Sequence, residues 1–194
     1  MSSSALHILR DEHAAIAAML NSALALAEAG PARDNPADFF DSVGGMLFYV
    51  DEFPERRHHP NESNLLFPML LKAAPEMRPV IHRLEMDHAA GEGRVRDLLH
   101  LLNGWRFVGD SRRDAFVQAL QEYVRFYLAH MRLEETELLP LIATRLDAAE
   151  RQQLDATFGA SRDPLIGGPL DDEYTTLFRR ITEQARAPVG LHAG

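Results

Sequence analysis

Apolar residues recur at spacings of three and four along most of this chain, which is the pattern of amphipathic helices. One such stripe joins Leu6, Leu9, Ile16, Leu20 and Leu24. The periodicity and the breaks at glycine and proline predict four long helices, over residues 4–29, 38–72, 76–103 and 111–144. Short loops between long helices favour an all-α fold, an antiparallel up-down four-helix bundle.

The last quarter of the chain has a different character. It predicts, in order, a short helix, a loop rich in glycine and proline, a further helix and a tail, over residues 147–158, 159–169, 171–187 and 188–194. We therefore expect a bundle over residues 1–146 and a C-terminal helical extension over residues 147–194. The extension is expected to pack on the bundle or on a second copy of the chain, as in a homodimer.

Two polar pairs interrupt the apolar pattern. His58 and Glu62 are four residues apart, and His130 and Glu134 repeat the spacing. Side chains four apart lie about 40° from one another around a helix, so both members of a pair can reach one point. In each copy a proline follows the glutamate by six residues, after a short apolar run. One pair has little weight, but its duplication indicates a site.

Pro60 lies inside the first of these pairs. A proline within a helix removes one backbone hydrogen bond and costs about 3 kcal/mol unless the helix kinks or restarts. The sequence therefore predicts a new helical segment or a locally distorted turn at Pro60. Such a distortion can direct both His58 and His59 inward, which a regular helix does less easily.

A second repeat concerns the helices that precede each pair. His13 and His88 each follow an acidic residue, and each has a leucine four residues earlier. The chain therefore contains two helix pairs of one design, whose inward side chains converge inside a bundle. The candidate metal ligands are His13, His58, His59, Glu62, His88, His130 and Glu134.

These donors indicate which metals suit the site. Several imidazoles and two carboxylates fit a pair of iron-like ions, because nitrogen ligands suit borderline metals and carboxylates can bridge and neutralise charge. Calcium and magnesium prefer oxygen ligands alone, and a single zinc ion would leave ligands unused. The chain has no cysteine, so thiolate sites are excluded.

The overall charge restricts the partners. A net charge of −9 disfavours binding to nucleic acid, which needs a basic face. No apolar run approaches the length of a membrane span, and the first residues lack a signal-type segment. We expect a cytoplasmic protein that binds neither nucleic acid nor membranes.

The motifs around these histidines and glutamates resemble the hemerythrin-like family, also called the HHE cation-binding domain, over about residues 1–145. The tail also resembles extensions of bacterial members. The resemblance implies two non-haem iron ions with an oxo or hydroxo bridge, held by five histidines and two carboxylates. Glu62 and Glu134 would bridge the ions. His13 and His58 would hold the iron with an open position, and His88 and His130 the other.

The third helix departs from the pattern of oxygen-carrying hemerythrins, which supply two histidines four residues apart. Here Leu84 and Glu92 stand on either side of His88. The resemblance implies that His59 replaces the missing imidazole, and Glu92 is the rival. This departure argues against reversible oxygen carriage more than against metal binding itself.

These observations favour a non-enzymatic di-iron protein that senses, stores or scavenges iron, oxygen, nitric oxide or peroxide. A ferritin-like di-iron oxidase or peroxidase is the first alternative, although ferritin-like sites are richer in carboxylates. A metal-free interaction bundle is the second. Tyr123 and Tyr127 are expected to pack in the core, with a hydrogen bond near the metals as the alternative. Glu12, Asp87 and Glu135 are expected to be solvated charges on helix surfaces, with a role as hydrogen-bond acceptors for the neighbouring ligands as the alternative.

Overall fold

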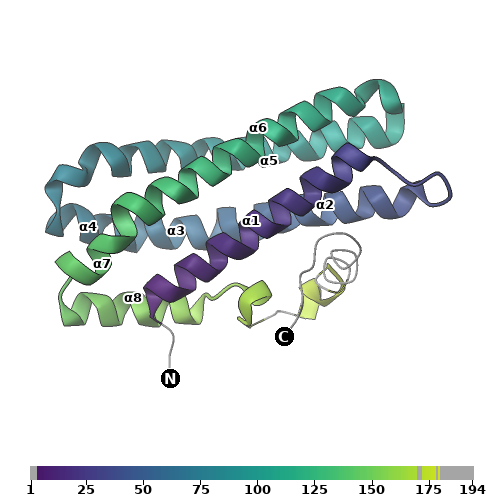
Figure 1. Cartoon of the computed structure of the whole chain (residues 1–194). Coiled ribbons are helices and arrows are strands. Elements are labelled where there is room, and N and C mark those ends of the chain that lie inside the picture. The colour runs from purple at the N-terminus through teal and green to yellow at the C-terminus, as the bar shows by residue number, and fades with distance from the viewer. Residues whose placement is uncertain (1–3, 170–171, 178, 180–194) are drawn as a thin grey trace.

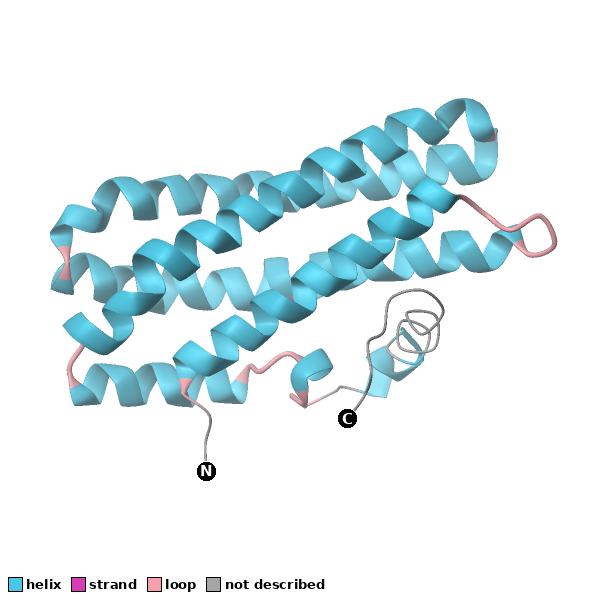
Figure 2. Cartoon of the chain, viewed as in Figure 1, coloured by secondary structure: helices cyan, strands magenta, loops and turns pink. Residues whose placement is uncertain are grey.

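The computed structural model describes residues 4–169, 172–177 and 179, and within these residues the chain forms helices and loops with no strand (Figure 2). All-helical folding is therefore confirmed for the described chain. The long helices are α1 (Ala5–Ala29), α2 (Pro36–Glu52), α5 (Arg78–Val108) and α6 (Arg113–Leu133). Shorter helices are α3 (His59–Asn61), α4 (Phe67–Ala73), α7 (Leu139–Arg145) and α8 (Ala148–Ala160).

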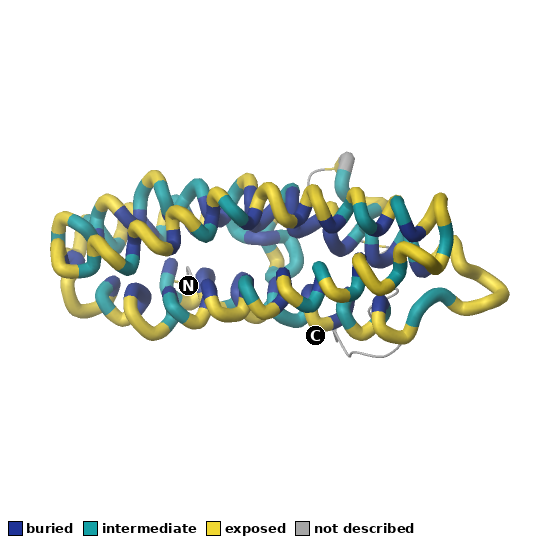
Figure 3. The backbone as a smooth tube through the Cα atoms, turned by 90° about the horizontal axis from the view of Figure 1, so that it is seen from above, coloured by how far each residue is buried: buried dark blue, intermediate teal, exposed yellow. Residues whose placement is uncertain are grey.

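The four long helices lie side by side (Figure 1). Both α1 and α5 contact both α2 and α6. The apolar residues of their stripes are buried. Buried positions recur along each of the four helices (Figure 3). Burial of these stripes supplies most of the stability, because isolated helices are marginal in water.

The buried apolar residues form two separate clusters along the bundle. One gathers around Trp105 and Phe116 and includes Ile16 of α1. The other gathers around Phe67 and Phe158 and includes Leu9 of the same helix. The polar residues of α1 that are buried between Leu9 and Ile16 therefore form a layer between two apolar regions.

The second predicted helix, 38–72, is present but irregular. Pro54–His58 (η1) and Glu62–Leu66 (η2) are π-helical turns on either side of α3. In the first, the His58 amide donates to the Phe53 carbonyl at 3.2 Å, five residues back. A π turn holds one more residue than a regular turn and often marks a functional site. Pro60 itself lies at the start of α3, and the distorted turns lie on either side of it, so the structure combines the two predicted alternatives. His58 and His59 are both buried.

A third π-helical turn, Glu134–Leu138 (η5), follows α6. Glu62 and Glu134 each begin such a turn, so the repeated His-x-x-x-Glu pairs share a local structure as well as a sequence pattern. Pro68 and Pro140 then fall within the first turns of α4 and α7. The residues before α4 and α7 are helical as well, so each proline removes one backbone donor from a continuous helical stretch directly after a π-helical turn.

The prediction that the third helix ends at Asn103–Gly104 is wrong. Helix α5 continues to Val108 and ends at Gly109, whose φ is +107°. Trp105 is 1% exposed and packs against Phe39 with ring centroids 5.0 Å apart. Burying this indole outweighs the roughly 1 kcal/mol that a glycine costs inside a helix.

Beyond the long helices, α8 packs against α1. Asp147 and Glu150 form a capping box at its start, and Leu154 and Phe158 are buried. A loop with a short 3₁₀ turn, Pro164–Ile166 (η6), follows, and η6 also contacts α1. Most of the helix predicted over 171–187 lies outside the described residues. No described helix combines the length and hydropathy needed to cross a bilayer.

Candidate metal centre

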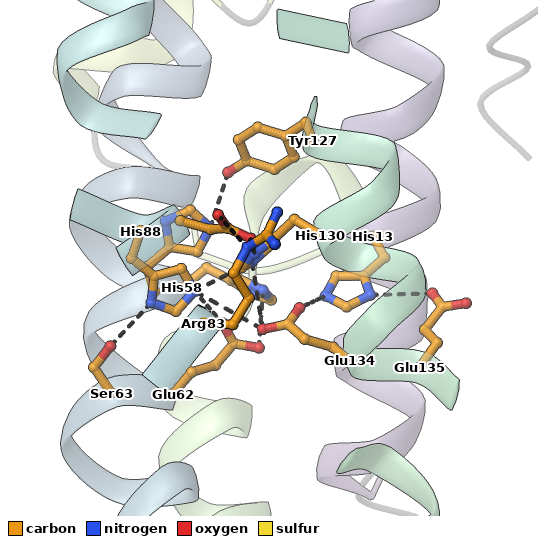
Figure 4. Close-up of polar contacts among 12 residues, drawn as sticks. His13, His58, Glu62, Ser63, Arg83, His88, Tyr127, His130, Glu134 and Glu135 are labelled. Carbon is orange, nitrogen blue, oxygen red and sulfur yellow. Dashed lines mark hydrogen bonds and ion pairs between the residues drawn. The ribbon is translucent and has the colours of Figure 1, made fainter. Parts of the chain in front are cut away.

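The structure brings the seven candidate ligands together in the polar layer of the bundle (Figure 4). They form two overlapping groups, and in each group one ligand atom per residue lies within 4.8 Å of the others. The first group is His59, Glu62, His88 and His130. The second is His13, His58, Glu62 and Glu134. All seven side chains are buried, and they come from α1, α3, α5, α6 and the three π-helical turns.

Each glutamate faces histidines from different helices. The two oxygens of Glu62 lie 3.3 Å from His58 Nε2 and 3.4 Å from His88 Nε2. The two oxygens of Glu134 lie 3.4 Å from His13 Nε2 and 3.4 Å from His130 Nε2. Each carboxylate is thus placed between two imidazoles, an arrangement that suits a bridging ligand.

Several of these atoms make no hydrogen bond to any described residue. They are both side-chain oxygens of Glu62, both side-chain oxygens of Glu134, and Nε2 of His13. Glu62 is 0% exposed, so its oxygens are withdrawn from water as well. Burying carboxylate oxygens that accept no hydrogen bond is costly, even with imidazoles nearby. A cation between the carboxylates removes that cost, so the residues present fit a metal site.

The outer nitrogens of these histidines have partners of their own. His58 Nδ1 donates to Glu12 at 2.7 Å, and His13 Nδ1 donates to Glu135 at 3.0 Å. Nδ1 of His88 lies 3.0 Å from the Ser63 hydroxyl. With Nδ1 hydrogen-bonded outward, Nε2 of each ring is directed at the centre, as in metal sites whose ligands are oriented by outer partners.

Two of the charges expected to be solvated therefore contact the centre. Glu12 is 4% exposed, so its expected position on the surface is wrong. Glu135 is partly exposed but is held by His13. Asp87 lies farther away, 3.8 Å from His130 Nδ1, and is bound by Arg83.

His59 differs from the other histidines. Its Nδ1 lies 3.0 Å from a Glu55 oxygen, and its Nε2 accepts a hydrogen bond from the Tyr127 hydroxyl at 3.0 Å. Its ring stacks on His88 with centroids 4.0 Å apart. The rival ligand Glu92 is exposed, pairs with Arg96 and belongs to neither group. Of the two candidates for the fifth nitrogen position, the structure brings only His59 into the cluster.

Glu55 is a further residue of the site that the sequence motifs did not single out. It is buried, and it also accepts a hydrogen bond from Tyr123 at 3.3 Å. A Cβ on Gly91 of the facing helix would lie 2.7 Å from its Oε1, so the glycine makes room for this carboxylate. The signal was present, because Glu55 and His59 share the four-residue spacing of the two repeated pairs in the opposite order.

Burial disfavours the charged form of these histidines, so the charged groups beside each ring determine whether its pKa rises or falls. Desolvation lowers the pKa of His13, but its contacts with Glu134 and Glu135 outweigh this and raise the pKa to about 9. The pKa of His88 is raised to about 9 by Glu134 and Glu62, again against desolvation. The same balance puts the pKa of His58 well above its ordinary value, chiefly through Glu62.

The remaining groups complete the charge pattern. Desolvation and neighbouring histidines put the pKa of His59 well below its ordinary value. The carboxyl of Glu62 has a pKa well below its usual range, because His58 outweighs desolvation. Desolvation raises the pKa of Glu55 to about 7. Without metal, protonated histidines therefore neutralise the central carboxylates at neutral pH.

A groove of about 250 Å³ leads from the surface to one side of the centre. It lies between α3 and α5 and is lined by residues that include Glu55, His59, Ser63, His88 and Glu92. His59 and His88 are the two candidate ligands that line this groove.

A helical bundle with a buried layer of histidines and carboxylates defines a class: helical proteins that bind metal cations between their helices. A known family within this class matches the chain. The Hemerythrin HHE cation binding domain matches residues 4–142, and the chain belongs to this family. Comparisons with curated proteins and with solved structures found no significant match.

Proposed function

We propose that the seven buried ligands hold two non-haem iron ions and that the protein binds a small molecule at this centre to sense, store or scavenge it. The candidates are iron itself, oxygen, nitric oxide and peroxide. When bound, iron supplies a redox-active position for such a ligand. The observation that carries the proposal is the set of four Glu62 and Glu134 oxygens, buried between imidazoles and without hydrogen-bond partners among the described residues.

The donor set supports two ions over one. Both ligand groups contain Glu62, but they share no histidine: one has His13 and His58 of the first half, and the other has His88 and His130 of the second half together with His59. A carboxylate shared between two groups is what a bridged pair requires. The proposal includes an antiparallel up-down arrangement of α1, α2, α5 and α6 in a cytoplasmic protein, with the bridged ions halfway along the bundle.

Nitrogen-rich ligation favours binding over turnover. The imidazoles are neutral ligands, and they leave less negative charge at the metals than a carboxylate-rich oxidase site. The chain's own groups then hold ligands in place: Glu12, Ser63 and Glu135 orient rings, and the groove beside His59 admits a small molecule.

Anaerobic loading with ferrous iron, followed by metal analysis, tests the proposal. We expect about two iron ions per chain. His130→Ala is expected to lose the pair, and His100→Ala, at an exposed histidine of α5, is the matched control. Fewer than one ion in the wild-type protein would overturn the proposal. Optical spectra with azide or nitric oxide, and a turnover assay with peroxide, then separate binding from enzymatic oxidation.

A further inference from the structure

One carboxylate connects the proposed centre to the C-terminal extension. Glu12 Oε2 accepts a hydrogen bond from His58 Nδ1 at 2.7 Å, and Glu12 Oε1 accepts one from the Asp163 backbone amide at 2.9 Å. Both oxygens of this buried group are therefore used. Asp163 lies some 100 residues after the candidate ligand His58 in the chain. Its loop nevertheless reaches His58 through a single intervening side chain, that of Glu12.

The loop that contains Asp163 is firmly seated. Its carboxylate accepts the Leu165 amide at 2.7 Å, and the Ser161 hydroxyl accepts the Asn61 side-chain amide at 2.7 Å. The space left beside Glu12, His58 and Asp163 is about 10 Å³. That is at most room for one water molecule. This side of the centre is closed, whereas the groove opens on the side of His59.

The loop lies outside the part of the chain that matches the family domain, which ends at residue 142. Nothing about the domain itself therefore accounts for a hydrogen bond from residue 163 to Glu12. The contact is a property of this chain and its extension.

We propose that residues 161–167 complete the metal centre, and that the Asp163 amide is the positioning group. By holding one oxygen of Glu12, it fixes the other against His58 Nδ1, which keeps His58 Nε2 directed at Glu62. The loop thereby retains the ion of the His13 and His58 half. This inference rests on the proposed dinuclear centre. Loss of an outer partner typically weakens metal binding 10- to 100-fold.

A proline at position 163 tests the amide directly. Asp163 has φ −61° and ψ 132°, a conformation that proline adopts before another proline, so Asp163→Pro removes the N–H donor with little change of backbone shape. Asp163→Ala is the matched control, because it removes the carboxylate and keeps the N–H. Glu12→Gln is the second variant. Its amide nitrogen cannot accept, so one of the two hydrogen bonds is lost while the shape is kept.

The full-length proteins are loaded with ferrous iron, and release into a strong chelator is followed together with the optical spectrum and helical circular dichroism. We expect Asp163→Pro and Glu12→Gln to release one of the two ions about 10- to 100-fold faster than Asp163→Ala, with the second ion unchanged. Equal release from all variants and wild type would overturn the inference. If Asp163→Pro does not fold, Glu12→Gln decides the outcome. A wild-type protein without bound iron would instead overturn the proposed function.

Discussion

Glu62 and Glu134 occupy equivalent positions: each is the first residue of a π-helical turn, and each lies between two imidazoles with both oxygens free of hydrogen bonds to the described residues. The equivalence does not extend to the outer face: His13 and His58 of the first half donate Nδ1–H to carboxylates, whereas in the second half His88 Nδ1 lies 3.0 Å from the Ser63 hydroxyl and His130 Nδ1 lies 3.8 Å from Asp87. The two halves of the chain therefore contribute matching carboxylates, but not matching outer partners, to one centre.

This symmetry predicts that either glutamate is indispensable for binding the pair. Glu62→Gln and Glu134→Gln each replace a carboxylate that we propose as a bridge by an amide with one acceptor, so we expect fewer than one iron ion per chain in metal analysis. Glu137→Gln is the control, since Glu137 is exposed in the same π-helical turn as Glu134. Full iron content in either core variant would contradict the bridging role.

Metal binding should be strongly dependent on pH. In the metal-free protein the pKa of His13 and that of His88 are about 9, and the pKa of His58 is raised as well. These imidazoles carry protons at pH 7, and a metal must displace them. Affinity should therefore rise from pH 6 to pH 8, with roughly three protons released per pair of ions. Calorimetry in buffers of different ionisation enthalpy measures this number, and the absence of proton release would contradict the charge pattern.

The same groups set the stability of the metal-free protein. A histidine whose pKa rises from 6.5 to about 9 on folding contributes stability that is complete below pH 6.5 and is lost as pH rises through 9. Burial of Glu55, with its pKa raised to about 7, acts in the same direction over a lower range. We expect the Tm of the chelator-treated protein to fall between pH 6.5 and 9. The iron-loaded protein should not follow this fall, because its histidines are already deprotonated.

Much of this centre could be predicted from sequence because its parts repeat. The pairs His58–Glu62 and His130–Glu134 share a spacing, and a helix places residues at such a spacing on one face. The four long helices could be predicted as well, because apolar residues that recur with the helical period mark the face of the helix that is buried. The predicted end of the third helix at Gly104 was wrong, because burial of Trp105 outweighs the tendency of a glycine to end a helix.

What could not be predicted depends on contacts between distant parts of the chain. Glu12 and Glu55 look like ordinary surface charges along their helices, and only packing of other elements over them buries them. Asp163 belongs to a loop whose position no periodicity specifies. The sequence places Glu12 next to a candidate ligand and Glu55 four residues from another, but which charges are buried and turned toward a ligand is visible only in the structure.

Two glycines of α5 give a test of the Glu55 contact. A Cβ at Gly91 would lie 2.7 Å from Glu55 Oε1, whereas a Cβ at Gly93 would meet nothing within 4 Å. Gly91→Ala should push the carboxylate away from His59 and weaken iron binding about 10- to 100-fold, as expected for the loss of an outer partner. Gly93→Ala should leave binding unchanged and stabilise the protein by about 0.5–1 kcal/mol, because alanine is the better helix former.

Comparing Gly91→Ala with Gly93→Ala separates an effect on Glu55 from a general effect of one added methyl group. Both substitutions add one methyl group to the same helix, so a loss of iron affinity confined to Gly91→Ala can only come from its surroundings. Glu55→Gln gives an independent check, because the amide keeps the shape of the side chain but loses one acceptor and the charge. Its affinity should fall in parallel with that of Gly91→Ala. If Gly91→Ala and Gly93→Ala bind iron equally well, Glu55 does not support His59, and His59 is held by Tyr127 and by its stacking on His88 alone.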